Sequence, residues 1–363
     1  MKIVKRITVL ADRLAVLLVA VCSAIAWMVM PFAVSASEDL PICWSPAQLK
    51  HVRNESSILK NIAAAYRAPL AGTPKAVEKA PNFVRGAIRR VRLPANVKKI
   101  ALTFDLCEQP YEISGYQGDI VDYLRSEGLA ATFFASGKWF LTHSERAQQI
   151  MADPLFEFGN HAWEHRNFRL LSKRRAQAEI NGAQLAYERT YRRLRERNCR
   201  VPSRAGGAHK VAAKQMTLFR FPYGACKKEA LDWVNNAGLL AIQWDVSSGD
   251  PWKGQTVAGM VNAVVSRAKS GSIVIFHANG RGWRTGEALP HIIRRLRARG
   301  FSFATVSDLL NTKGAMPVTS ETCYDARPGD SDRYDNLARK LEQRYQAFYA
   351  RFAKPQANGA KQR

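Results

Sequence analysis

The segment IALTFDLCE, residues 100–108, decides the fold of this chain. It opens with a run of apolar and β-branched residues, Ile100–Asp105, which predicts a strand buried on both faces. The run ends at a carboxylate, Asp105, which would therefore stand at the carboxyl end of its strand. In α/β barrels the catalytic residues lie at that end of the strands. We therefore expect Asp105 to mark the edge of the sheet that carries the active site.

Similar short strands alternate with helical patterns over the next two hundred residues. The further strands expected are Ala130–Ala135, Phe156–Asn160, Leu218–Pro222, Leu239–Val246, Ser272–His277 and Phe301–Thr305. The helices expected between them are Ile120–Ser126, Ser172–Arg197, Lys227–Ala237, Thr256–Lys269 and Glu287–Arg299. Repeated β–α units predict a parallel sheet with right-handed crossovers. The fold class is therefore α/β, an incomplete (β/α) barrel of about seven parallel strands.

Four parts of the chain differ in composition. Residues 1–36 are a targeting segment, residues 37–96 a basic N-terminal extension with several prolines, and residues 97–311 the α/β domain. Residues 312–363 form a basic C-terminal extension in which residues 331–352 have a helical pattern. Residues 198–216, rich in Gly, Pro, Ser and basic side chains, indicate a loop inserted into the domain.

The first 36 residues have the features of a secretory signal. A basic start is followed by an apolar stretch over residues 14–34, and Val34, Ser35 and Ala36 offer small residues for cleavage. The apolar stretch is also long enough to remain as an uncleaved membrane anchor. Either alternative predicts an exported protein, periplasmic or otherwise outside the cytoplasm. In the second case, residues 14–34 would anchor the protein in the membrane.

The net charge of +25, from 55 Lys and Arg against 30 Asp and Glu, predicts attraction to an anionic partner. A membrane surface and a charged or lipid-linked glycan both fit this charge. Zinc-finger spacings and RNA-binding aromatic motifs do not accompany the basic residues, so a nucleic acid is not expected as a partner.

Five cysteines follow the targeting segment, so at least one cannot pair within the chain. Cys107 and Cys226 each follow a candidate active-site strand, and we predict a bridge between them. Cys43 and Cys323 flank the domain, and a second predicted bridge joins them. Sequence does not determine connectivity, so both pairings are hypotheses.

Two histidines in GNHAWEH, His161 and His165, are spaced as ligands of a metal ion. On a helix, residues four positions apart point in the same direction. A catalytic divalent metal such as zinc takes neutral imidazole nitrogens and keeps one position open for water. The alternative is a buried histidine pair whose nitrogens are satisfied by hydrogen bonds.

Further polar residues stand at the ends of later strands. Arg220 and Tyr223 occur in FRFPYG, Asp250 and Trp252 in SGDPW, and His277 ends SIVIFH. Each could be an ordinary ion pair, turn residue or strand end. Their recurrence at successive strand ends favours one shared site.

These motifs resemble those of the polysaccharide deacetylase family, the NodB-homology group of carbohydrate esterase family 4. They occur in order as TFD at 103–105, NHxxxH at 160–165, RFPY at 220–223, an Asp-Trp motif at 250–252 and IFH at 275–277. The resemblance covers residues 97–311. It implies a distorted (β/α) barrel and a metal-dependent hydrolase that removes N-acetyl or O-acetyl groups from a glycan.

The resemblance also implies a role for individual residues. Asp105 would be the general base, held in position by Arg220, and His161 and His165 would bind one divalent metal ion, with zinc expected from the nitrogen ligands. The backbone N–H of Tyr223 would stabilise the oxyanion.

His277 would be the general acid, oriented by Asp250, and Trp252 and Trp163 would wall the acetyl pocket. Amide hydrolysis needs an activated water, an electrophile and a proton for the leaving amine, and this set of residues supplies all three functions.

One position departs from the family pattern. A second Asp, the third metal ligand, is expected directly after Asp105, and this chain has Leu106 there. Glu108 is the favoured replacement, and Cys107 is less favoured if it forms a disulfide. The alternatives are a site with two protein ligands and water, or a weakened or lost metal.

The leading hypothesis is an exported, metal-dependent glycan deacetylase, a hydrolase of non-peptide carbon–nitrogen bonds in the cell envelope. A metal-free glycan-binding pseudoenzyme is one alternative, and a membrane-surface scaffold is another. Within the enzyme class, a lipid-linked amino sugar carrying a formyl or acetyl group is the alternative substrate.

Overall fold

A computed structural model describes residues 41–199, 212–324 and 330–352 of the chain. The predicted targeting segment, most of the predicted inserted loop and the last eleven residues lie outside these ranges. Within the described ranges, none of the helices combines the length and apolar character needed to cross a membrane.

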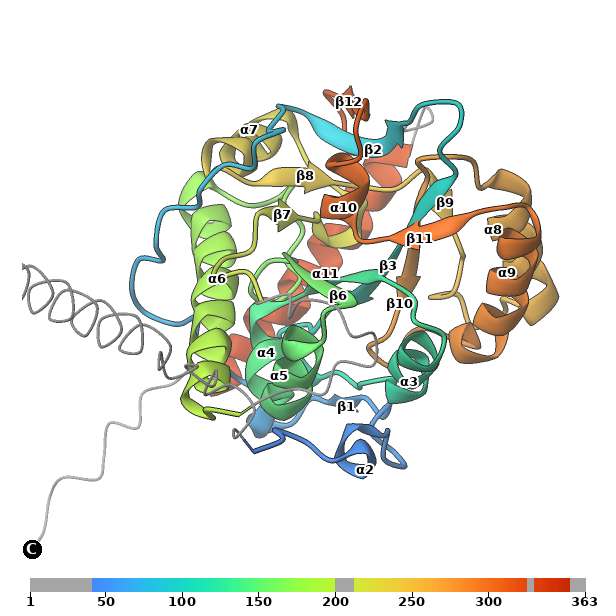
Figure 1. Cartoon of the computed structure of the whole chain (residues 1–363). Coiled ribbons are helices and arrows are strands. Elements are labelled where there is room, and N and C mark those ends of the chain that lie inside the picture. Colours follow the sequence, from blue (N-terminus) through green and yellow to red (C-terminus); the bar gives the residue numbers. More distant parts are fainter. Residues whose placement is uncertain (1–40, 200–211, 325–329, 353–363) are drawn as a thin grey trace, which may run out of the picture. The chain divides into compact units, whose positions relative to one another are not determined.

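The main sheet is a curled half-barrel of parallel strands (Figure 1). Its strands, in spatial order, are β12 (Met316–Ser320), β2 (Ala87–Arg92), β8 (Leu240–Ile242), β7 (Leu218–Phe219), β6 (Phe156–Asn160), β5 (Ala131–Ala135), β3 (Lys99–Leu106), β10 (Ile273–His277) and β9 (Val246–Ser247). β11 (Ser302–Ala304) pairs with β3 as well. β12 is antiparallel to β2, and the other pairings are parallel, so the predicted α/β class and incomplete barrel are confirmed.

The sheet contains more strands than the sequence pattern predicts. The expected strand Leu239–Val246 is divided into β8 and β9, and β2 and β12 come from the two predicted extensions. β2 has the sequence AIRRVR and is only partly buried. Its basic residues interrupt the apolar pattern by which a buried strand is predicted. The sheet curls so that β2 approaches the start of β10. The N–H of Val91 in β2 donates to the carbonyl of Gly271, just before β10, at 2.8 Å.

Helices cover the sheet at the expected places. The five predicted helices are α3 (Gly118–Ser126), α6 (Lys173–Glu196), α7 (Lys228–Asn236), α8 (Val257–Arg267) and α9 (Thr285–Ala298). Helices that the pattern did not indicate are α2 (Pro46–Leu49), α4 (Gly137–Thr142), α5 (Ser144–Ala152) and α10 (Val306–Leu310), with short 3-10 turns at Ala63–Ala65 and Pro222–Gly224. A small two-stranded sheet joins β1 (Leu59–Lys60) and β4 (Glu112–Ile113).

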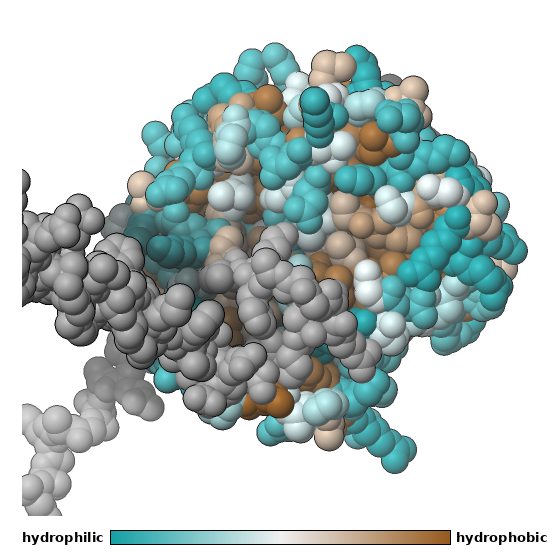
Figure 2. Space-filling view, in the orientation of Figure 1, coloured by the Kyte–Doolittle hydropathy of each residue, from teal (hydrophilic) through white to brown (hydrophobic). Residues whose placement is uncertain are grey.

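The core consists of apolar side chains between the sheet and these helices. Phe104 of β3 stacks between Phe133 of β5 and Phe276 of β10, with ring centroids 5.5 and 5.3 Å apart. All three rings are fully buried, and burial of each stabilises the fold by about 1.5–3 kcal/mol. This packing fixes the central strands, whose carboxyl ends carry the polar motifs. On the face shown in Figure 2, hydrophilic residues surround smaller hydrophobic areas, as the high net charge leads one to expect.

The C-terminal helix α11 (Asp330–Phe352) packs beside the polar edge of the sheet. Its Asp335 accepts two hydrogen bonds from Arg169, at 2.6 and 2.7 Å, and its Glu342 pairs with Arg166. Tyr345 and Phe348 of the same helix belong to a small buried apolar cluster with Tyr111. Residues from the predicted C-terminal extension therefore form part of the wall around this edge.

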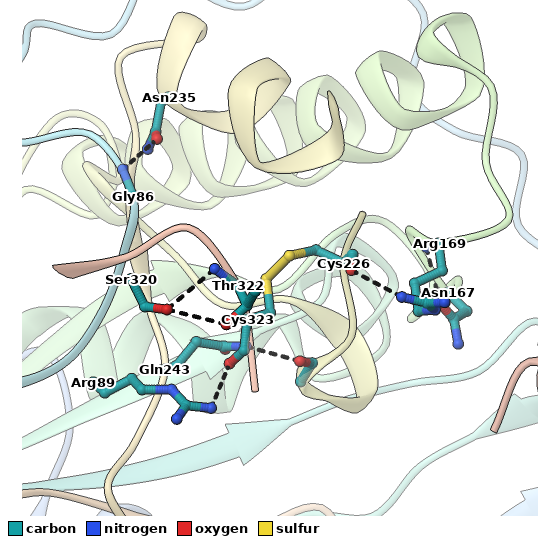
Figure 3. The surroundings of a disulfide bond; sticks show 11 residues. Gly86, Arg89, Asn167, Arg169, Cys226, Asn235, Gln243, Ser320, Thr322 and Cys323 are labelled. Carbon is teal, nitrogen blue, oxygen red and sulfur yellow. Dashed lines mark hydrogen bonds between the residues drawn. A yellow bond between two sulfur atoms is a disulfide. The ribbon is translucent and has the colours of Figure 1, made fainter. Parts of the chain in front are cut away.

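Both predicted disulfides are wrong. The structure pairs Cys43 with Cys199, just after α6, and Cys226 with Cys323. Figure 3 shows the second bridge, which joins the turn after β7 to the segment after β12. Cys107 is free and buried, and its Sγ accepts a hydrogen bond from Asn279 Nδ2 at 3.2 Å. The pairing of Cys226 with Cys323 depends on where β12 adds to the sheet, which the sequence pattern did not reveal.

Candidate active site

The pairing of β3 with β10 brings the predicted base and acid together. In the parallel register of these strands Asp105 is the partner of His277, and both stand at the carboxyl end of the strand. Asp105 is almost completely buried and His277 is largely buried, and both line a cavity of about 420 Å³. Two residues far apart in the sequence therefore share one site because their strands are neighbours.

Arg220 fixes one oxygen of Asp105. Its Nη1 donates to Asp105 Oδ1 and to Thr103 Oγ1, both at 2.8 Å, while Nε and Nη2 donate to carbonyls of Ile242 and Gln243 at 3.3 Å. The guanidinium lies 4.0 Å from the centroid of the Phe134 ring and is completely buried. The Arg220 side chain therefore has little freedom to move. The second oxygen of Asp105, Oδ2, faces His161 and lies 3.6 Å from its Nε2.

His277 is held by Asp250. The ring nitrogen Nδ1 lies 2.9 Å from Asp250 Oδ1, and the backbone N–H of His277 donates to Oδ2 at 2.6 Å. Thr285 Oγ1 also donates to Oδ2, at 2.8 Å. Burial lowers the pKa of His277, but the charge and hydrogen bond of Asp250, with a smaller contribution from Asp105, outweigh burial, so the pKa lies above its ordinary value. The imidazole of His277 can therefore carry a proton, and because Asp250 engages Nδ1, Nε2 is free to exchange a proton with a bound molecule.

The two histidines of the HxxxH motif converge, although not on a helix as predicted. Residues 161–165 form a turn after β6, with left-handed backbone at Ala162 (φ 66°) and His165 (φ 60°). The side chain of Asn160 accepts the N–H of Ala162 and Glu179 accepts that of Glu164, which hold the turn. The rings of His161 and His165 lie 4.9 Å apart, centroid to centroid.

Each of these imidazoles has a buried nitrogen without a hydrogen bond. They are His161 Nε2 and His165 Nδ1, while His161 Nδ1 lies 2.8 Å from the carbonyl of Arg220. Burial lowers the pKa of both rings. A buried polar atom without a partner is costly, so the alternative of a pair satisfied by hydrogen bonds does not describe these two nitrogens. Their donor atoms fit a metal ion that takes imidazole.

Glu108 is not placed to share such an ion. Its Oε2 accepts hydrogen bonds from the N–H of Ser114 at 3.1 Å and from Thr142 Oγ1 at 2.8 Å, and the side chain is completely buried. Burial raises its pKa to about 7, although the charge of Lys138 opposes the rise. Among the described His, Cys and acidic residues, the group able to hold one ion is Cys107, His161 and His165. The prediction that Glu108 is the third ligand is therefore wrong, because its loop turns the carboxylate toward α4.

Neither predicted tryptophan lines the cavity. Trp163 is completely buried, fits against Gly137 and Gly182, and donates its indole N–H to the carbonyl of Arg67. Trp252 is 67% exposed and belongs to the surface. The tryptophan that does line the cavity is Trp244, which the motif search missed because it lies before the Asp-Trp motif.

Tyr223 and Arg281 complete the cavity wall. Tyr223 has left-handed backbone (φ 60°), and its ring packs edge-on against His165 at 4.3 Å between centroids. Its hydroxyl lies 2.8 Å from that of Tyr345 in α11. Arg281, which sequence reasoning did not single out, makes a two-fold ion pair with the fully buried Glu112 at 2.6 and 2.8 Å. One side of the cavity is therefore held in place by residues distant in sequence, Tyr345 for Tyr223 and Glu112 for Arg281.

Comparisons with known proteins give one family. The family model described as polysaccharide deacetylase matches residues 92–213. The chain is 26% identical over 223 residues to a chitooligosaccharide deacetylase of Azorhizobium caulinodans, covering 58% of this chain and 94% of the relative. It is 29% identical over 224 residues to a peptidoglycan-N-acetylglucosamine deacetylase of Bacillus cereus, covering 61% and 92%.

The fold also has solved counterparts. A carbohydrate esterase family 4 pseudoenzyme from Bacillus anthracis aligns with a TM-score of 0.51 at 22% identity, over 63% of this chain and 70% of the other. At that identity the likeness shows the fold alone.

Proposed function

Because the chain belongs to the polysaccharide deacetylase family, we propose that it is a hydrolase that removes an N-acetyl or O-acetyl group from a glycan. One observation carries this proposal. A carboxylate held by Arg220 and an imidazole held by Asp250 end adjacent strands, on the wall of a cavity beside two unpartnered imidazole nitrogens. Acyl-group hydrolysis needs this combination of base, acid and electrophile.

His161 and His165 would hold one divalent metal ion, and zinc suits their nitrogen donors. A divalent ion bound there supplies Lewis-acid polarisation of the acetyl carbonyl and lowers the pKa of water.

The residues of the chain supply the proton transfers. Asp105 would accept a proton from the attacking water through Oδ2, because Arg220 already engages Oδ1. His277 would donate a proton from Nε2 to the leaving nitrogen, with Asp250 holding Nδ1. The backbone N–H of Tyr223 is the proposed donor to the oxyanion, and the strained backbone at this residue is typical of functional positions.

The proposed substrate is a cell-envelope glycan. The two relatives named above act, by their names, on chitooligosaccharides and on peptidoglycan. The net charge of +25 would favour an acidic or lipid-linked glycan, or one close to an anionic membrane surface. Leu106 favours one rival, a glycan-binding protein without catalysis.

Acetate release tests these alternatives. The purified protein, reconstituted with zinc, is incubated with chitooligosaccharides, peptidoglycan fragments and a lipid-linked N-acetyl amino sugar, and free acetate is measured. We expect acetate from at least one of these substrates. Glycan binding without acetate release would instead identify the pseudoenzyme.

The mature protein is expected to begin near Ser37, outside the cytoplasm. Removal of the N-terminal segment follows from its basic start, apolar stretch and small residues before Ser37. The intact mass of the native protein, purified from fractionated cells, measures this directly. A full-length chain in membranes would instead support the uncleaved anchor, and a full-length chain in the cytoplasm would contradict export.

Asp250→Asn is expected to move the alkaline limb of the activity profile to lower pH. The general acid works in its protonated form, so activity falls as pH rises through the pKa of His277. Asp250 raises that pKa, and removing its charge lowers it. The pH dependence of kcat for both proteins measures the shift. An unchanged or higher alkaline limit would show that His277 is not the acid that limits activity there.

A further inference from the structure

The backbone of β3 explains why residue 106 has no role at the site. Successive side chains of a strand point to opposite faces, so in β3 Leu106 points away from the face that carries Asp105, and Cys107 follows directly after the end of the strand. Leu106 is completely buried and belongs to the main apolar cluster. A side chain at position 106 therefore packs in the core, whereas the one at position 107 lines the cavity with Asp105.

Cys107 lies with the two imidazoles. Its Sγ and one ring nitrogen each of His161 and His165 lie within 4.8 Å of one another, and all three residues are buried. Ligand atoms around a tetrahedral zinc ion are about 3.5 Å apart when their bonds are about 2.0–2.3 Å long. An adjustment of roughly 1 Å by one side chain would thus be enough to bring the three donors onto one ion.

The surroundings of the sulfur also fit a ligand. Asn279 Nδ2 donates to Cys107 Sγ at 3.2 Å and to the carbonyl of Cys107 at 2.7 Å, which fixes the orientation of the residue. Cys107 is not in a disulfide, so the thiol is available. The two imidazole nitrogens beside it, His161 Nε2 and His165 Nδ1, are buried without a hydrogen-bond partner.

We propose that Cys107 is the third protein ligand of the metal ion, forming a His2Cys site with His161 and His165. The inference rests on the metal-binding part of the proposed function and adds the identity of its third ligand. A thiolate carries the same single negative charge as the missing carboxylate. As a soft ligand it favours zinc and cobalt over magnesium and manganese, which prefer oxygen. Three protein ligands also leave a position open for water.

X-ray absorption of the zinc-loaded protein tests the ligand set without reference to activity. We expect one sulfur at about 2.3 Å together with nitrogen or oxygen at about 2.0–2.1 Å. The cobalt-substituted protein should show a sulfur-to-metal charge-transfer band in the near ultraviolet. Both signals should disappear in Cys107→Ser, and its zinc affinity should fall by at least about 10-fold.

Two variants separate ligation from disturbance of the loop. Cys107→Asp should bind zinc with nitrogen and oxygen ligands alone, which shows that the position can reach the ion without sulfur. Glu108→Gln, next in sequence but turned toward α4, should keep the sulfur signal. Loss of the signal in Glu108→Gln with its retention in Cys107→Ser would overturn the proposal.

The outcomes distinguish this inference from the proposed function. Zinc bound without sulfur refutes the role of Cys107 and leaves deacetylation untouched. Zinc bound with sulfur but no acetate release supports the His2Cys site and refutes the proposed reaction. If the purified protein binds neither zinc nor cobalt, the inference and the metal-dependent mechanism both fail.

Discussion

Asp105→Asn and His277→Ala are each expected to lower the turnover of a deacetylated glycan by about 10²–10⁴-fold, the usual contribution of a general acid or base. The amide introduced by Asp105→Asn could still accept a hydrogen bond from Arg220 but could not take a proton from water. The His277→Ala variant would leave the amine to depart without a proton. Turnover measured by acetate release at saturating substrate gives both effects.

Matched controls separate chemistry from folding. Asp232 pairs with Arg85 on the surface and His291 lies on the exposed side of α9, so Asp232→Asn and His291→Ala should retain the turnover of the parent. Circular dichroism should be the same for all four variants. Near-parental turnover in Asp105→Asn or His277→Ala would show that the assigned proton transfers are wrong.

Much of the fold could be predicted because buried parallel strands have a simple pattern. Runs such as Ile273–His277 are apolar almost throughout, which is the pattern of a strand buried on both faces. β2 was missed because a strand with two central arginines lacks that pattern. It joins the sheet through pairing with β8, a strand that lies far away in the sequence.

The candidate site could be located for a related reason. The carboxyl ends of parallel strands meet at one edge of a sheet, so polar residues placed there, such as Asp105 and His277, come together whatever their separation in sequence. The roles proposed for these residues remain predictions until they are tested by substitution.

The directions of individual side chains could not be predicted in this way. The HxxxH spacing suggested a helix, but two left-handed residues turn the rings together instead. Glu108 was favoured as a ligand by its charge, but the chain after β3 places Cys107, and not Glu108, beside the two imidazoles. The disulfide between Cys226 and Cys323 and the contact of Tyr345 with Tyr223 depend on how β12 and α11 add to the domain, which no local pattern records.

Arg220→Gln is expected to destabilise the protein by about 3–5 kcal/mol, because removing one partner of a buried ion pair leaves the other charge uncompensated. Arg220 is completely buried and Asp105 nearly so, and the guanidinium also binds Thr103 and two backbone carbonyls. The urea concentration at the midpoint of unfolding should fall accordingly. Turnover should fall as well, since Asp105 loses the contact that orients it.

A second substitution tests whether the buried charge is the cause. In the double variant Asp105→Asn/Arg220→Gln no carboxylate is left unpaired, so we expect it to unfold at a higher urea concentration than Arg220→Gln alone. Arg85→Gln, which breaks an exposed ion pair with Asp232 at 3.3 Å, should change stability by no more than about 1 kcal/mol. If the double variant were less stable than Arg220→Gln, packing and the hydrogen bonds of the guanidinium would account for the loss, and Arg220 would be a structural residue rather than the partner that holds Asp105 in place.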